Sequence, residues 1–150
     1  MAIILLLATL FFSIFTSGIN WYLQTNHFPS LVNVSPGNFH DYHKAYNRRG
    51  LFSFWGPGLL GLGLNLMLLF RHPWSIPDWQ IQLALVLIIL ALASSLFLNF
   101  PQHKILGSHG YSDQIIRKLV NLNWLRTLLC TAHSIWLTWV VYQLIDLTKL

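Results

Sequence analysis

Four apolar runs, each long enough to cross a lipid bilayer, constrain this chain more than any other feature of its sequence. They extend over residues 2–23, 51–70, 81–100 and 124–145. A bilayer core needs about 20 apolar residues per helix. Inside it, backbone polar groups must bond within their own segment, which favours helices. The sequence therefore predicts a single all-α domain over residues 1–150, an integral membrane protein built as a four-transmembrane-helix bundle.

The first run is predicted to be a retained span and not a cleaved secretory signal. A signal would carry a basic segment before the apolar run and a small-residue cleavage motif after it, and neither is present. The run also ends in Trp21 and Tyr22. These aromatic side chains favour the membrane–water interface.

Charge and cysteine content exclude two classes of function. Charged residues make up 9% of the chain, against roughly 25% in soluble domains. The net charge of +5 comes from basic residues that flank the apolar runs, so we expect no nucleic-acid partner. The single cysteine, Cys130, lies inside an apolar run and is expected to pack there. A redox mechanism through a pair of cysteines is excluded.

Basic residues are distributed unequally between the two sides of the predicted bundle. Four crossings place the long loops 24–50 and 101–123 on one side and the short loop 71–80 on the other. The opposite side holds only Arg71 and Lys149. The positive-inside rule then predicts that both long loops are cytoplasmic and both termini external. The basic residues on the long-loop side are Lys44, Arg48, Arg49, Lys104, Arg117, Lys118 and Arg126.

Each long loop is expected to contain a short amphipathic helix that lies at the membrane interface. Residues 39–46 repeat aromatic side chains and His43 at helical spacing, which predicts one aromatic face turned towards the membrane. Residues 112–120 begin with Ser112 as a candidate N-cap and carry an apolar stripe. The two halves of the chain share the same order of features. This order is consistent with a two-fold internal repeat, although the residues themselves do not align.

Histidines on the cytoplasmic side form the first candidate site. Histidine is the commonest metal ligand and titrates near neutral pH, so such a cluster can bind a metal or haem or relay protons. The alternative is a set of interfacial polar residues without a ligand. We predict His27, His43 and His103 as catalytic or metal-binding residues, because of their similar depth or their position on the aromatic face. His40 and His109 are predicted to be solvated.

Polar residues in and near the spans form the second candidate site. Arg126 lies close enough to the interface to snorkel to water, so structural and anion-binding roles are both open. His133 lies roughly three turns inside the membrane. It is expected to bond within the bundle to a neighbour such as Asn65. The predicted ligand-binding residues are Gln24, Asn123, Trp124, Arg126 and His133.

Several of these motifs resemble those of a group of uncharacterised bacterial four-span membrane proteins. The segment 18–29 is similar to the group's first-span ending, and residues 39–48 resemble its F-x-x-Y-H helix. Residues 101–103 and 123–127 resemble its P-x-H turn and N-W-x-R-T motif. The group is itself distantly similar to anthrone oxygenase-like proteins. The resemblance implies a bacterial inner-membrane location.

Two departures from that group concern a buried acid and a buried base. Gly61 stands where the group carries a glutamate, and His133 stands where it carries an arginine. Their joint loss suggests that they pair, because losing one alone would strand a charge. A mechanism that needs the carboxylate is therefore placed in doubt.

Two classes of function remain open. The first is an oxidoreductase or oxygenase that acts on a lipophilic substrate, such as a quinone, polyketide or lipid, with a metal, a haem or no cofactor. The second is a non-catalytic lipid-binding protein, or an accessory subunit of a homo-oligomer or larger membrane complex. Membrane lipids and a lipophilic small molecule are the expected partners in both.

Overall fold

The computed structural model describes residues 1–50, 52 and 55–147, and every regular element in these residues is helical. The elements in the first half of the chain are α1 (Ala2–Tyr22), η1 (Leu23–His27), α2 (Phe28–Ser30), η2 (Leu31–Asn33), α3 (Pro36–Gly50) and α4 (Gly56–Arg71). The remaining elements are α5 (Asp78–Ser94), η4 (Ser95–Asn99), α6 (Phe100–His109) and α7 (Asp113–Leu147). The all-helical fold predicted from the sequence is confirmed for these residues.

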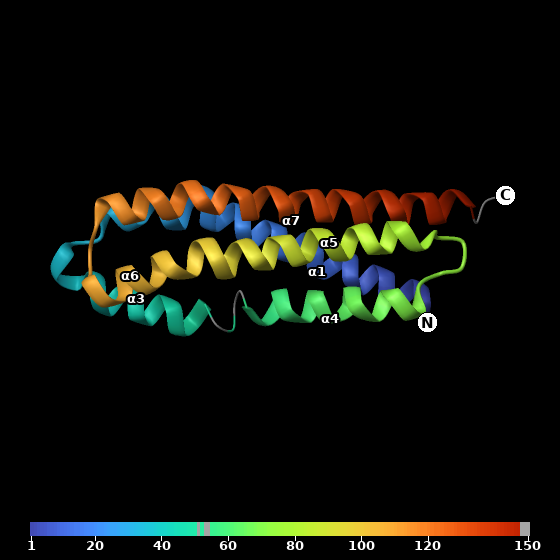
Figure 1. Ribbon diagram of the computed structural model, residues 1–150, viewed down its shortest axis with the longest axis horizontal. Helices are drawn as coiled ribbons and strands as arrows, with labels where there is room; N and C mark the ends of the chain where they lie inside the picture. The colour runs from blue at the N-terminus through green and yellow to red at the C-terminus, as the bar shows by residue number, and fades with distance from the viewer. Residues whose placement is uncertain (51, 53–54, 148–150) are drawn as a thin grey trace.

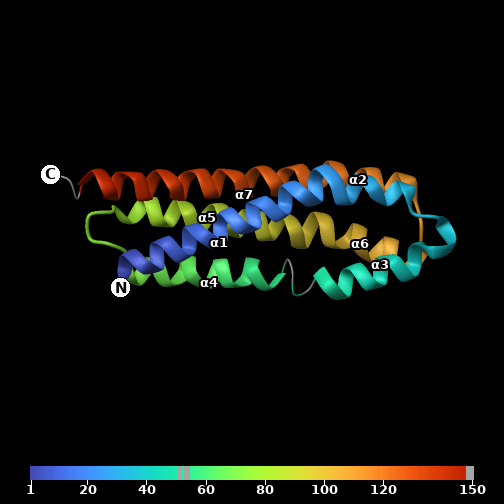
Figure 2. The same cartoon turned by 180° about the vertical axis from the view of Figure 1, so that it is seen from behind.

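The helices form four rows that run along the length of an elongated molecule (Figure 1). One row is α1 to η2, one is α5 to α6, and one is α7. In the fourth row α3 and α4 lie end to end, as both views show (Figure 2). The two termini lie at the same end of the bundle, and the turns after η2 and α6 lie at the other.

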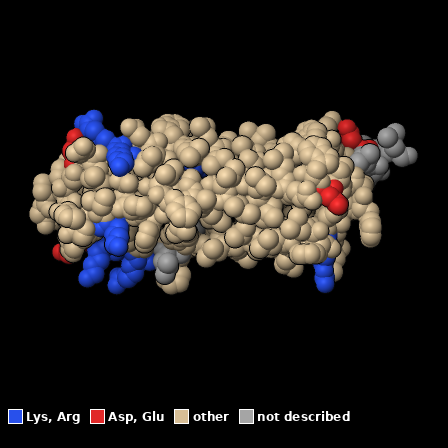
Figure 3. Space-filling model, in the orientation of Figure 1, with Lys and Arg blue, Asp and Glu red and all other residues tan. Residues whose placement is uncertain are grey.

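Within the described residues, three helices are long and apolar enough to cross a membrane: Ala2–Asn33, Asp78–His109 and Asp113–Asp146. α4 is apolar but has 16 residues. The predicted second span began at residue 51, and residues 51, 53 and 54 lie outside the described part of the chain, as does Lys149. The face shown in Figure 3 agrees with a membrane location, since its charged side chains gather towards the two ends and its middle is almost free of them.

The predicted long loops are wrong over much of their length, because the first and third helices continue past their expected ends. Residues 24–33 and 101–109 are helical. Pro29 and Pro101 had indicated helix ends. Each follows a five-residue π-helical segment, η1 or η4, and lies in the first turn of the next α-helix. A π-helical turn already departs from the α-helical bonding pattern, so it accommodates a proline with less cost.

The second predicted interfacial helix is also wrong as a separate element. Residues 113–120 form the first turns of α7, which runs without a break for 35 residues. Ser112 does precede this helix as predicted, and its hydroxyl accepts a bond from the backbone N–H of Ile115 at 3.5 Å.

Two buried apolar clusters hold the ends of the bundle together. Near the termini, Leu6, Leu68 and Leu137 belong to the first. At the other end, Phe28 and Phe39 belong to the second, which joins α2 and α3 to α6 and α7. The aromatic face of α3 therefore packs into the bundle and does not face lipid as predicted. The extensions of the first and third helices supply the surface on which it packs.

Candidate functional site

Two histidines from different helices meet at the α3 end of the bundle. Nε2 of His43 lies 3.3 Å from Nδ1 of His103, and Nδ1 of His43 lies 3.3 Å from the amide nitrogen of Asn47. Because an amide nitrogen only donates, Nδ1 of His43 accepts from Asn47 and its proton sits on Nε2. His43 then donates to His103, whose own proton is on Nε2. A directed chain of hydrogen bonds thus leads from the exposed Asn47 to His103.

Tyr46 connects the third predicted histidine to this pair through ring contacts. The rings of His27 and Tyr46 stack with centroids 4.1 Å apart, and those of Tyr46 and His103 lie 6.0 Å apart. Nε2 of His27 is buried and makes no hydrogen bond with any described residue. His27, His43 and His103 are therefore brought to one end of the bundle, as expected, but His27 joins by stacking and not by a hydrogen bond.

The predicted metal role of these histidines finds no support in their arrangement. Within the described residues, no group of three or more His, Cys, Asp or Glu side chains is placed to hold a metal ion. Ring stacking also aligns imidazole faces, whereas metal ligation needs ring nitrogens that converge on one point. Binding of a metal or haem stays a prediction from the sequence.

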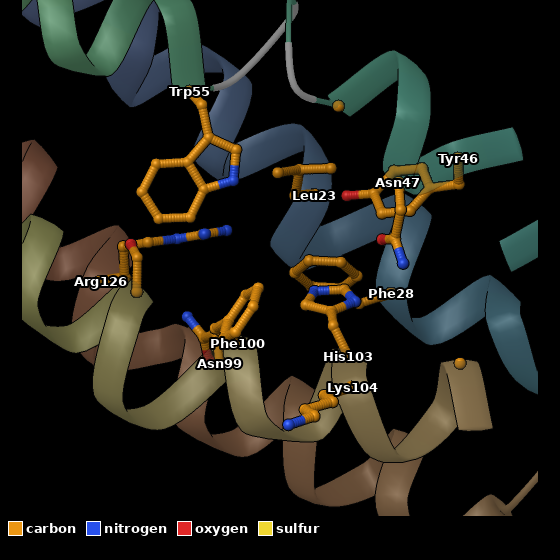
Figure 4. A pocket seen from close by; sticks show the side chains of 13 residues that line it. Leu23, Phe28, Tyr46, Asn47, Trp55, Asn99, Phe100, His103, Lys104 and Arg126 are labelled. Atoms are coloured by element: carbon orange, nitrogen blue, oxygen red, sulfur yellow. The ribbon is translucent and has the colours of Figure 1, made fainter. Parts of the chain in front are cut away.

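A cavity of about 330 Å³ opens beside His103, between α3, α6 and α7 (Figure 4). Arg126 lines it and is only 4% exposed, so it does not snorkel to the surface. In Figure 4 the Arg126 guanidinium lies beside the Trp55 indole, with Asn99 nearby. Most of the wall is apolar or aromatic. The lining residues that matter below are Leu23, Phe28, Tyr46, Trp55, Asn99, Phe100, His103, Lys104 and Arg126.

Burial keeps two side chains that α3 contributes to the site, His43 and Tyr46, uncharged. Burial lowers the pKa of His43, and the nearby charges of His27 and His40 lower it further. The Tyr46 pKa is raised to about 12, mainly by burial and against the opposing effect of Arg126. Near neutral pH, His43 is thus a neutral imidazole and Tyr46 a neutral phenol.

A second cavity of about 400 Å³ lies between α1 and α3, on the other side of Tyr46. Its lining includes His27 and Arg49 together with the rings of Tyr22 and Tyr42. Tyr46 lines both cavities, so this one side chain forms part of the wall between them.

Two of the predicted ligand-binding residues, Gln24 and Asn123, bond to each other. The Asn123 amide donates to Oε1 of Gln24 at 2.7 Å, and the Asn99 amide donates to Oδ1 of Asn123 at 3.4 Å. Neither Gln24 nor Asn123 is part of the cavity lining, whereas Asn99 is. This network ties the first and third helices to α7 and thereby positions the cavity wall.

Of the three other predicted ligand-binding residues, Arg126 lines the cavity, whereas Trp124 and His133 do not. Trp124 is 41% exposed and meets Trp21 edge-on. His133 is buried, with Nε2 3.2 Å from Oδ1 of Asn65 and Nδ1 2.7 Å from the Ser13 hydroxyl. The predicted bond between His133 and Asn65 is confirmed.

Sequence reasoning did not select Tyr46, Trp55, Asn99 or Lys104 as site residues. Tyr46 could have been selected, because it lies three residues after His43 and therefore on the same face of the helix. No sequence pattern pointed to Trp55 or Lys104, because their position at the cavity depends on how α3 packs along α6.

No known protein family, curated protein or solved structure matches this chain. The resemblance noted in the sequence therefore stays a prediction. What the site does has to be argued from its own geometry.

Proposed function

We propose that the chain crosses the membrane four times, with α4 in the second span and both termini external. At 1.5 Å per residue α4 is about 24 Å long, close to the bilayer core of about 30 Å. It runs along the bundle beside α1 and α5 (Figures 1 and 2). The Lys and Arg side chains concentrated at the α3 end support a cytoplasmic location for that end.

The function that we propose is binding of a lipophilic small molecule, with its polar head held in the cavity beside His103. One observation carries this proposal: Arg126, 4% exposed, and His103 line a cavity whose other walls are largely apolar. Small-molecule sites are typically apolar cavities of about 300–1,000 Å³ with a few convergent polar groups. A quinone, a polyketide or a lipid has the required combination of an apolar body and a polar head.

The hydrogen-bond chain through the two histidines favours a second candidate, an enzyme that transfers a proton to or from that molecule. His103 can donate from Nε2 to a bound oxygen and receive the Nε2 proton of His43 at its own Nδ1 through the 3.3 Å bond. For this step to balance, Nδ1 of His43 takes a proton from solvent, because the Asn47 amide beside it does not give one up. Arg126 would stabilise negative charge on the substrate oxygen. This step moves a proton only, so an oxidoreductase or oxygenase that uses it would take its oxidant from outside this chain.

The binding proposal is tested on protein purified in mild detergent, by extraction and mass spectrometry of the lipophilic molecules that come with it. We expect a retained molecule in the natural protein and in His109→Leu, which alters an exposed histidine outside the cavity. His103→Leu should reduce the retained amount. Equal retention in both variants, or none in the natural protein, would count against the proposal.

Redox chemistry is tested on the same samples. A visible absorption spectrum and metal analysis detect a haem or a bound metal. Proton transfer is tested separately, by incubating the protein with the extracted molecule in deuterated water and following exchange at its acidic positions. Exchange that is fast in the natural protein and lost in His103→Leu would support the enzyme.

A further inference from the structure

The charges around the cavity are all of one sign. Arg126 lines its buried part, and Lys104 lines it from an exposed position on α6. All four acidic residues of the chain are aspartates, and none of them is among the described residues that line the cavity. Two of them are engaged elsewhere, Asp78 with His72 and Asp113 with Arg117.

The surroundings of Arg126 strengthen its attraction for an anion. Phe100 and Trp55 line the cavity with it, and Arg126 is 4% exposed, so its guanidinium lies in a largely water-free environment. Charge interactions are several times stronger in such an environment than in bulk water. A guanidinium also forms paired, charge-assisted hydrogen bonds with a carboxylate or phosphate. Neutral carbonyl groups receive much less of this stabilisation.

The volume and shape of the cavity limit the rest of the ligand. About 330 Å³ accommodates a single chain or a compact ring system. Leu23 and Phe28 line the side of the cavity towards the first helix and offer an apolar surface to that part of the molecule.

We infer that the cavity is selective for a lipophilic anion, whose carboxylate or phosphate head binds Arg126 and whose apolar body lies against Leu23 and Phe28. This inference rests on the proposed function and narrows its ligand class. Lys104 attracts the anion at the exposed rim, and Arg126 holds it. Uncharged lipids and oxidised quinones are then poor ligands.

Three probes with the same hydrocarbon chain test the inference: oleate, oleyl phosphate and methyl oleate, the last being the neutral analogue. Binding to purified protein is measured by equilibrium dialysis at fixed detergent concentration. We expect at least one of the two anions to bind about tenfold or more tighter than methyl oleate, as the loss of one charge-assisted bond would give. The comparison of oleate with oleyl phosphate identifies the preferred head.

Variants separate a specific site from general attraction to basic residues. Arg126→Gln should weaken anion binding about tenfold and leave methyl oleate unchanged, whereas Arg126→Lys should keep part of the preference. Arg49→Gln is the matched control, because Arg49 lines the neighbouring cavity at the same end of the bundle. Its effect should stay within about twofold.

The outcomes distinguish the inference from the proposed function. Equal binding of methyl oleate and both anions would overturn the inference and leave a lipophilic-ligand site. An equal loss in Arg49→Gln and Arg126→Gln would also overturn it. Binding of none of the three probes, together with no lipophilic molecule retained on purification, would overturn the proposed function and the inference with it.

Discussion

His43 donates a hydrogen bond to His103 at 3.3 Å, and this bond joins α3 to α6 across 60 residues of sequence. Nδ1 of His103 must be unprotonated to accept this bond, and Nδ1 of His43 must be unprotonated to accept from Asn47. α3 forms one wall of the cavity. Attachment of that wall therefore depends on the protonation state of the histidine pair.

Acidification is expected to loosen α3. Burial holds the pKa of His43 below its usual value, so an undocked α3 binds a proton that the docked helix does not. Stability is then fully present above about pH 6.5 and falls as the pH drops below it. His103 lies against His43, and positive charge on His27 or His40 lowers the pKa of His43 further. Hydrogen exchange of the α3 amides at pH 7.5 and 5.5 measures the effect.

His43→Gln is the control for this pH dependence. Its amide can still donate to His103 but does not titrate, so α3 should exchange with a smaller difference between the two pH values. An unchanged pH dependence in His43→Gln would show that another group is responsible.

Tyr46 is expected to stabilise the fold through its aromatic ring and not through its hydroxyl. Tyr46→Phe keeps the stacking on His27 at 4.1 Å and should leave stability nearly unchanged. Tyr46→Leu loses an aromatic pair worth about 0.5–1.5 kcal/mol and also part of the wall between the two cavities. Thermal unfolding in detergent compares the two variants. Equal destabilisation of both would indicate that the hydroxyl carries the effect.

The parts of the fold that follow from local chemistry could be predicted from the sequence. Long apolar runs gave the helical architecture, because a bilayer permits few other structures. His133 was expected to bond within the bundle because it lies too deep to reach water, and it does bond to Asn65. The ends of the helices could not be predicted. Pro29 and Pro101 usually indicate a boundary, and nothing local signals the π-helical segments before them.

The candidate site could be predicted only in part, since its geometry depends on tertiary packing. The sequence identified the three histidines and Arg126, because such residues are rare beside apolar runs. It placed the aromatic face of α3 against lipid. His43 was therefore predicted to point towards the membrane, whereas it packs into the bundle. Once α3 packs on α6, Tyr46 comes between two cavities and Lys104 reaches the rim of one of them. No spacing within one segment contains that information.

The buried pair of His133 and Asn65 is predicted to stabilise the bundle without affecting ligand binding. Asn65→Leu leaves Nε2 of His133 without its acceptor at 3.2 Å. Such bonds inside membrane proteins contribute about 0.6–1.7 kcal/mol. The double variant Asn65→Leu with His133→Phe removes both polar groups and should recover part of the lost stability. Thermal unfolding measures this, and reduced retention of the bound molecule would contradict the purely structural role.

The orientation of the bundle gives the last prediction. A reporter enzyme active only outside the cytoplasm, fused after Leu150, should be active, and the same reporter inserted at Gly110 should be inactive. Gly110 lies between α6 and α7 at the basic end of the molecule, so a linker inserted there interrupts neither helix. A second reporter, active only in the cytoplasm, should give the opposite result at each of the two positions. A cytoplasmic terminus together with an external Gly110 would mean that the positive charge at the α3 end does not set the orientation. Equal signals at both positions would mean that the chain does not cross the membrane once between Gly110 and Leu150, as the proposed topology requires.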